Sequence, residues 1–337
     1  MFEPQSEPRV FGVSLGQDFS IALYQGLNAR FEKMAPTDVA KVEIYVNTRR
    51  MERRLTSLFH TGNALLLPRI RLITDLAQDA LVQTISPAIS PLRRRLEVAQ
   101  LIKKLITADP SLASQDAAFD LADSLVALMN EMQGEGVPPE VIKNLNVTDQ
   151  SGHWERALKF VSLVQDFFAN DQPDAEGRQR LVIEQIVSNW ERDPPDQPLI
   201  VAGSTGSRGA TSLFMQAVAK LPKGAIVLPG FDMDMPDRVW EMLEPEKGGE
   251  DHPQFRFKTL CSAMEIIPNA VQSWTENTNV NKDRNKLISL SLRPAPITHQ
   301  WIKDGPELTD LENATHCISL IEAPTPRAEA EAIAVRL

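Results

Sequence analysis

The chain has 337 residues, of which 42% are hydrophobic and 24% charged, and its formal net charge is −10 at pH 7. This is the composition of a soluble globular protein with room for one large domain or two modest ones. The acidic balance argues against a protein that coats nucleic acid non-specifically, although it leaves room for a local basic groove. Two cysteines without metal-type spacing, Cys261 and Cys317, argue against a disulfide framework and against a zinc site.

Neither a membrane span nor a secretion signal is visible in the sequence. No apolar run approaches the roughly 18–20 residues that cross a bilayer. The first residues, MFEPQSEPRV, lack the basic and then apolar order of a signal peptide. We therefore expect a cytoplasmic protein without membrane contacts.

The N-terminal part of the chain alternates between strand and helix patterns. Three short apolar runs are typical of buried strands: Arg9–Leu15, Lys41–Asn47 and Arg69–Thr74. Between them, apolar residues recur at helical spacing over 18–34 and 49–59, and Asp18 and Thr48 are placed to cap these helices. Strand and helix in alternation predict a parallel sheet covered by helices.

Only helical patterns follow from about Pro91 to Trp190. Four stretches have apolar residues at helical spacing: 91–106, 116–132, 153–168 and 175–190. We therefore predict a helical subdomain inserted between two strands of one sheet. The chain then divides into a first α/β part (1–85), a helical insertion (86–195), and the remainder of the α/β domain with the start of a next segment (196–337).

Strand patterns return after the insertion. LIVAGS (Leu199–Ser204) and GAIVLPGFD (Gly224–Asp232) are continuous apolar runs, and the segment between them, Ala210–Leu221, has a helix pattern. Residues 233–312 carry many Pro, Asn and Asp residues and show weak periodicity. We expect irregular structure with short helices there.

A last strand is expected at Cys317–Pro324, followed by a helix with Thr325 as its cap and Pro326 at its first position. The sequence stops inside this helix pattern, without a terminal glycine or asparagine. We therefore expect the chain to be a piece of a longer protein.

The loop GSTGSRGATS after the strand at 199–204 has the layout of a phosphate-binding loop without its chemistry. Such a loop reads G-x-x-x-x-G-K-[ST], in which the lysine reaches the phosphates and the hydroxyl holds Mg²⁺. Here Gly203 and Gly209 are one residue too far apart, and alanine follows Gly209. The simplest interpretation is a tight strand-to-helix turn. Another is a loop whose hydroxyls and arginine contact a phosphate of a larger polyanion: Ser204, Thr205, Ser207 and Arg208.

The loop after the first strand, GVSLGQDFS, is no better equipped for ATP. Gly12 and Gly16 are present, but no Gly-Lys-Thr follows them. Asp18 stands at the start of the helix, where a carboxylate repels phosphate. Two further patterns favour ordinary surface structure: the TGSRG sequence, in which Ser207 lies too far past the strand for a hydrolase nucleophile, and the aspartates of FDMDMPD, which lack a calcium loop's glycine and glutamate.

Arginines cluster in two places. For Arg93–Arg95 we expect a solvated helix face. The other cluster, Arg49, Arg50, Arg53 and Arg54, begins at the carboxyl end of a strand, where open parallel sheets bind ligands. Thr48, Thr74, Asp75 and the 203–209 loop are expected at the same edge, and together these groups could follow a nucleic-acid backbone.

Several segments of the sequence resemble the AddB family of double-strand break repair proteins, in its alphaproteobacterial form. The segments that carry the resemblance include YVNTRRMERRL, LPRIRLITDLA, FDLADSLVALMNEMQGEGV, VAGSTGSRGATSLFMQAV and EAPTPRAEAEAIAVRL. The resemblance spans essentially the whole chain and covers only the N-terminal part of an AddB protein. It implies a degenerate superfamily 1 helicase core, related to P-loop NTPases, with an inserted helical subdomain.

The resemblance also implies a function. AddB partners the AddA helicase–nuclease, which carries the ATP-driven motor, in resecting double-strand DNA ends for homologous recombination. The N-terminal part of AddB threads single-stranded DNA and reads a recombination hotspot. The family's iron–sulfur cluster and its Mg²⁺-dependent nuclease lie near the C-terminus and are outside this sequence, so no cofactor, metal or catalytic residue is expected here.

Some AddB proteins keep a lysine P-loop, and this chain departs from that pattern at Gly12–Ser20. It also has Ala202 where an active helicase has its Mg²⁺-binding acid. The DNA-facing segments of such cores match Thr48, Arg49, Arg50 and Arg53 and, after the next strand, Thr74 and Asp75. Two alternatives stay open: a nucleotide-dependent enzyme that uses the 203–209 loop, and a pure interaction protein that uses the helical insertion.

Overall fold

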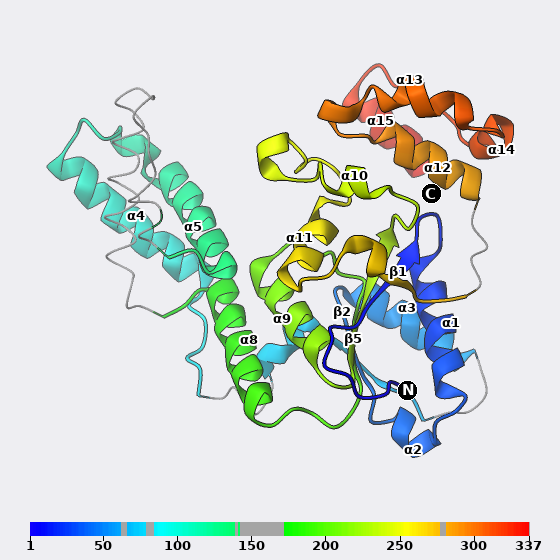
Figure 1. The fold of residues 1–337 in the computed structure, drawn as a ribbon. Coiled ribbons are helices and arrows are strands. Elements are labelled where there is room, and N and C mark those ends of the chain that lie inside the picture. Colours follow the sequence, from blue (N-terminus) through cyan, green and yellow to red (C-terminus); the bar gives the residue numbers. More distant parts are fainter. Residues whose placement is uncertain (62–65, 79–83, 139–140, 142–171, 277–280, 337) are drawn as a thin grey trace.

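A six-stranded parallel sheet organises the computed structural model, which describes residues 1–61, 66–78, 84–138, 141, 172–276 and 281–336 (Figure 1). The strands are β1 (Val10–Ser14), β2 (Glu43–Val46), β3 (Arg69–Leu72), β4 (Leu199–Ala202), β5 (Gly224–Phe231) and β6 (Gln272–Ser273). Their order across the sheet is β3-β2-β4-β5-β1-β6. The predicted α/β class with a parallel sheet is therefore confirmed.

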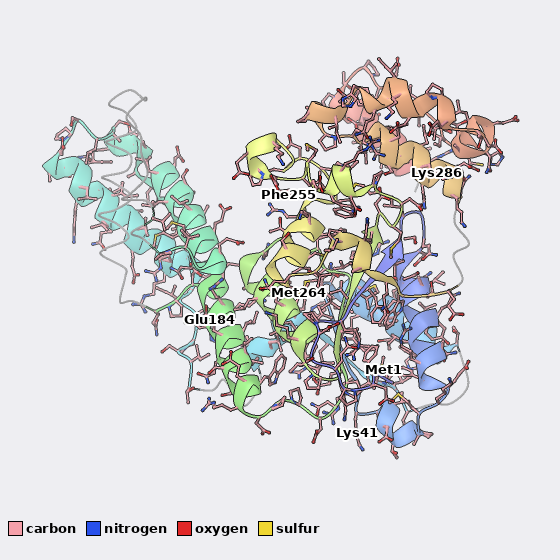
Figure 2. The ribbon with its side chains drawn as sticks, in the orientation of Figure 1. Met1, Lys41, Glu184, Phe255, Met264 and Lys286 are labelled. Atoms are coloured by element: carbon pink, nitrogen blue, oxygen red, sulfur yellow. The ribbon has the colours of Figure 1, made fainter. Side chains whose placement is uncertain are left out.

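The sheet is covered on both faces because its strands alternate between two apolar cores. On β4, Ile200 and Ala202 join one core, and Leu199 and Val201 join the other. The first core packs against α1 (Phe19–Phe31) and α3 (Arg49–His60), and the second against α8 (Ala175–Arg192), α9 (Gly209–Lys220) and α11 (Phe255–Ala263). Strands buried on both faces read as continuous apolar runs, as the sequence showed. Figure 2 shows the side chains that fill both layers.

The predicted helix caps are present. The side chain of Asp18 accepts a hydrogen bond from the Ile21 amide at the start of α1, and that of Thr48 accepts one from the Met51 amide at the start of α3. Thr325 does the same for α15 (Pro326–Arg336) by accepting from the Ala328 amide. Each cap satisfies an amide that has no partner inside its helix.

The inserted helices form an arm beside the sheet, which we call the helical arm and define as α4 (Pro91–Ala108), α5 (Ala118–Glu135) and α8 (Figure 1). α4 and α5 bury their own small core. In α8, by contrast, Val182, Ile183 and Ile186 belong to the core of the sheet. The helix predicted at 153–168 lies outside the described residues.

The arginines at 93–95 are not a uniformly solvated face. Arg93 is exposed and pairs with Glu97, and Arg95 is half-buried and pairs with Asp123. Arg94 is buried and donates a hydrogen bond to the carbonyl of Gln172 at 2.6 Å. The prediction therefore fails at Arg94, because the chain segment before α8 covers that side of α4.

Short helices follow β5, as predicted for this region: α10 (Asp237–Trp240), α11, α12 (Lys282–Ser291), α13 (Gln300–Asp304) and α14 (Leu311–Thr315). A four-residue helix, α2 (Pro36–Val39), lies before β2. The strand predicted at Cys317–Pro324 is wrong, because that segment is largely exposed and pairs with no strand of the part of the chain that the structure describes. β6 takes the last place in the sheet instead, beside β1.

Candidate nucleic-acid interface

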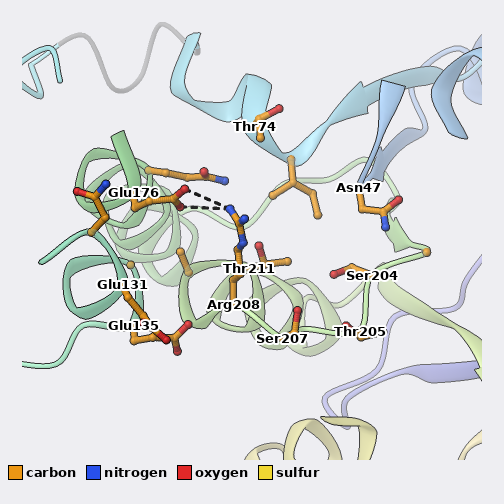
Figure 3. Close-up of a pocket in the computed structure, with 16 residues that line it drawn as sticks. Asn47, Thr74, Glu131, Glu135, Glu176, Ser204, Thr205, Ser207, Arg208 and Thr211 are labelled. Carbon is orange, nitrogen blue, oxygen red and sulfur yellow. Dashed lines mark hydrogen bonds and ion pairs between the residues drawn. The ribbon is translucent and has the colours of Figure 1, made fainter. Parts of the chain in front are cut away.

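A pocket of about 650 Å³ opens at the carboxyl ends of β2, β3 and β4, between the sheet and the helical arm (Figure 3). The sheet side contributes Asn47 after β2, Thr74 after β3 and the 203–208 loop after β4. The arm side contributes three carboxylates, Glu131, Glu135 and Glu176. The ligand-binding edge of an open parallel sheet is thus lined by hydroxyl and amide groups on one side and by acids on the other.

The structure brings together half of the residues that the sequence proposed for DNA contact. Five of them line the pocket: Thr74, Ser204, Thr205, Ser207 and Arg208. The other five do not line it: Thr48, Arg49, Arg50, Arg53 and Asp75. Ser204 is only 8% exposed, and its hydroxyl accepts a hydrogen bond from the Gly206 amide. Its oxygen is therefore used within the loop.

Carboxylates of the helical arm bind the donor groups of the loop after β4, which we call the second glycine loop (residues 203–209). Glu135 Oε1 accepts a hydrogen bond of 2.8 Å from the backbone amide of Gly209, the first residue of α9. Arg208 pairs with both carboxylate oxygens of Glu176, at 3.2 and 3.5 Å (Figure 3). A phosphate at the start of α9 would meet these carboxylates first.

No sequence pattern indicates that either acid lies at this loop. Glu135 and Glu176 lie 74 and 32 residues away from their partners along the chain. Gly209 makes the approach possible, because a Cβ there would come within 2.8 Å of the Glu135 Cα. Glycine at 209 therefore permits contact between α5 and α9, and its role here is close packing of two helix ends.

Protein groups also contact the loop after β1, the first glycine loop (residues 12–20). Asp18 caps α1 at the place where a P-loop would bind phosphate. From the other side, the Asn285 amide nitrogen on α12 donates a hydrogen bond of 3.1 Å to the carbonyl of Leu15. The C-terminal helices therefore lie over the end of β1 (Figure 1). Protein groups therefore contact both glycine loops at the start of the helix that follows.

The basic helix α3 stands beside the pocket at the same edge of the sheet. Arg49, Arg50 and Arg53 are exposed, and among the described residues they make no ion pair within 4.0 Å. Arg54 lies 3.7 Å from Asp18. Because Thr48 caps α3 with its side chain, its backbone and that of Arg49 are fixed at the end of β2. The carboxylate of Asp75, by contrast, accepts from the Leu72 amide and is turned back toward β3.

A buried polar cluster joins the end of β5 to α12. Asp232, predicted to lie in a solvated loop, is only 4% exposed, and burial raises the pKa of its carboxyl group. Its backbone amide donates to Gln254, and Arg293 donates to the carbonyl of Ser289 and to Gln300. The expectation of a solvated Asp232 is wrong because the C-terminal helices cover this loop.

His252 belongs to the same cluster, and acid should destabilise the fold through it. Burial and the nearby Arg293 lower the pKa of the imidazole, whose Nδ1 accepts from the Gln254 amide. The unfolded chain takes up this proton near pH 6.5, at about the ordinary value, and the folded chain only at lower pH. Stability is therefore lost as the pH falls through the unfolded-state pKa, and a smaller loss is expected in His252→Gln. Urea midpoints of both proteins at about pH 7.5 and 5.5 measure the difference. An equal loss in both would contradict it.

No protein-family model and no curated protein matches the chain. Within the described ranges, no helix is both long and apolar enough to cross a membrane. In the same ranges, His, Cys, Asp and Glu side chains form no group of three that could hold a metal ion.

Proposed function

We propose that this chain is the helicase-like module of a cytoplasmic AddB-type repair subunit, which binds single-stranded DNA and does not hydrolyse ATP. In this role the carboxyl edge of the sheet holds the strand, and the module is a scaffold for an AddA-type helicase–nuclease that supplies the motor. The proposal rests on the resemblance of the sequence segments and on the charges at the sheet edge. Iron–sulfur, Mg²⁺ and ATP chemistry would then belong to other parts of that assembly.

The observation that carries the proposal is the row of arginines on α3. Arg49, Arg50 and Arg53 face solvent at a sheet edge, in a protein of net charge −10, with no carboxylate within ion-pair distance among the described residues. Guanidinium groups bind phosphate with well-defined geometry, and contacts to the backbone need no base sequence. A single strand that follows α3 would pass the mouth of the pocket, where hydroxyl and amide groups are available.

The second candidate, a nucleotide-dependent enzyme that uses the 203–209 loop, has less support. Such an enzyme needs free amides and a free cation at the start of α9. Here Glu135 and Glu176 hold these groups. ATP with Mg²⁺ is therefore expected to leave the thermal unfolding midpoint unchanged, whereas a nucleotide at ~100 times its Kd would add roughly 2.7 kcal/mol.

DNA binding by the arginine row should weaken steeply with salt. We expect a fluorescent oligothymidylate to bind the chain, and we expect Arg49→Ala/Arg50→Ala to reduce the slope of log K against log salt by about 1 to 2. The reason is that counterions are released when an arginine binds a phosphate, so binding with two fewer arginines releases fewer counterions. Fluorescence anisotropy over a series of KCl concentrations gives both slopes.

A matched control for this experiment is Arg93→Ala/Arg95→Ala, which removes the same charge from the arm, away from α3. Its slope should equal that of the unmodified protein within error. If the isolated chain does not bind the oligonucleotide even at low salt, the DNA-binding assignment is wrong for this chain. That result would favour an interaction module that uses the helical arm. Equal slopes in all three proteins would show that the DNA strand does not bind at α3.

A further inference from the structure

The helices α12, α13 and α14, which we call the C-terminal cover, pack mainly on one another. α12 lies against both α13 and α14. Arg284 of α12 donates a hydrogen bond of 2.9 Å to the carbonyl of Ala314 in α14. Trp301 Nε1 of α13 donates one of 2.9 Å to the carbonyl of Leu290 in α12. In Figure 1 the three helices (orange to red) lie together beyond the end of β1, so the cover is a unit with its own internal contacts.

The cover shares little apolar surface with the sheet. Among its described residues, Ile297 alone packs against a core of the sheet, from a partly buried position. Its buried apolar residues, Leu290 and Ala314, belong to none of the three apolar cores of the described residues. α8, by contrast, contributes three buried aliphatic side chains to the sheet core. Apolar burial, the main source of stability in a fold, therefore fastens the cover only weakly.

Polar side chains of α12 fasten the cover to the ends of two strands. The Asn285 amide donates a hydrogen bond of 3.1 Å to the carbonyl of Leu15, which follows β1. One turn further along α12, the Ser289 side chain is hydrogen-bonded to the carboxyl group of Asp232, which follows β5. Asn285 and Ser289 are 8% and 5% exposed. The buried face of α12 thus meets the sheet through an amide and a hydroxyl group.

Two further polar contacts lie beside this face. The imidazole of His252 interacts with the backbone of Leu292 at the end of α12. Arg238 of α10 donates a hydrogen bond of 3.0 Å to Asp304 of α13. The Arg238 side chain is 49% exposed, and exposed ion pairs of this kind contribute little to stability.

Buried charge weakens the same joint. Burial raises the pKa of the Asp232 carboxyl group and lowers that of the Arg293 guanidinium, so the closed arrangement disfavours both charges. Their mutual attraction offsets only part of this cost. Both groups would regain water if the cover left the sheet, and this makes opening less costly than the number of contacts suggests.

We propose that α12–α14 form a detachable cover, which opens as one unit from the ends of β1 and β5 while the sheet stays folded. Opening would expose the first glycine loop, whose residues 12–20 do not line the pocket of Figure 3. The cover would therefore control access to a second part of the carboxyl edge. It is attached by groups of the chain itself and needs no DNA, so it goes beyond the proposed function and does not depend on it.

Native-state hydrogen exchange of the full chain, in a series of low urea concentrations, measures this opening. We expect the amides of α12, α13 and α14 to share one opening free energy, smaller than that of the β4 amides. We also expect it to depend less on urea, because opening of the cover exposes less surface than global unfolding.

Asn285→Ala/Ser289→Ala removes the two side chains that α12 directs at the strand ends. Amides of the cover should then exchange roughly tenfold faster, since two hydrogen bonds are lost, while β4 amides keep their rates. Alanine favours helix, so α12 itself is preserved. The matched control is Lys286→Ala/Ser291→Ala, which truncates two exposed side chains of the same helix and should leave all rates unchanged; Figure 2 labels Lys286.

Three results would overturn the proposal. The first is exchange of the cover amides with the same free energy and urea dependence as β4, since cover and sheet would then open only together. The second is an equal acceleration of cover and β4 amides in Asn285→Ala/Ser289→Ala, or none at all. The third is the same acceleration in the control. Because no DNA is present, the result for the cover and the result for DNA binding can fail separately.

Discussion

Replacing Trp274 by alanine should be among the most damaging single changes in the chain, with a loss of about 3–5 kcal/mol in the free energy of unfolding. The indole is 1% exposed and lies edge-on against Phe11, with the ring centroids 5.1 Å apart. Its Nε1 donates to the Leu23 carbonyl at 3.2 Å, and the Arg30 guanidinium lies 3.8 Å from the ring centroid. Alanine would leave a cavity between α1 and the sheet, and it would remove the aromatic face against which the Arg30 guanidinium packs.

Gly26 shows how closely the indole fits. A Cβ at this position of α1 would collide with the ring of Trp274, so the helix is open to the side chain only because glycine is there. Urea denaturation of Trp274→Ala measures the loss. Trp301→Ala is the control, because this tryptophan is 49% exposed and should cost about 1 kcal/mol or less. Similar losses in the two variants would contradict the assigned packing.

The sequence predicted the parallel sheet because the signals for it are local. Continuous apolar runs marked β1, β2, β4 and β5, and capping side chains marked the starts of α1 and α3. The order of the strands is a different matter. β4 lies between β2 and β5, although more than a hundred residues separate it from β2, and no local pattern encodes that neighbour.

Two errors have the same physical origin. The segment Cys317–Pro324 has the composition of a strand, but a strand forms only where a neighbouring strand offers hydrogen bonds. Among the described residues, no strand lies beside this segment. β6, in contrast, is only two residues long and carries no pattern, yet it pairs with β1 because the chain passes beside it. Tertiary contacts decided both cases.

The position of the candidate site in the fold could be predicted from the sequence, but the residues that contact its loop could not. The sequence placed Thr74 and the 203–209 loop at one edge, and the structure confirms that they line one pocket. It could not show that Glu135 and Glu176 reach that edge, since acids on helices usually face solvent. It also placed Arg53 and Thr74 together, whereas α3 carries Arg53 away from the pocket.

Phe214 tests whether the arm and the sheet share one core. This side chain on α9 is fully buried; its ring lies edge-on against Tyr45 of β2 at 5.1 Å and tilted against Trp190 of α8 at 5.8 Å. One ring thus joins the sheet to the last helix of the arm. Aromatic contacts of this kind add to the burial of apolar area.

Phe214→Ala should therefore lower the free energy of unfolding by about 3–5 kcal/mol and loosen α8 together with the sheet. Denaturation gives the loss, and hydrogen exchange should show faster amide exchange over both α8 and β2. Phe119→Ala, at a 40% exposed position on α5, should cost about 1 kcal/mol or less and leave exchange in β2 unchanged. If Phe214→Ala sped up exchange in the sheet while α8 kept its protection, α8 would be stabilised by the arm alone. The core of the arm and the core of the sheet would then be independent.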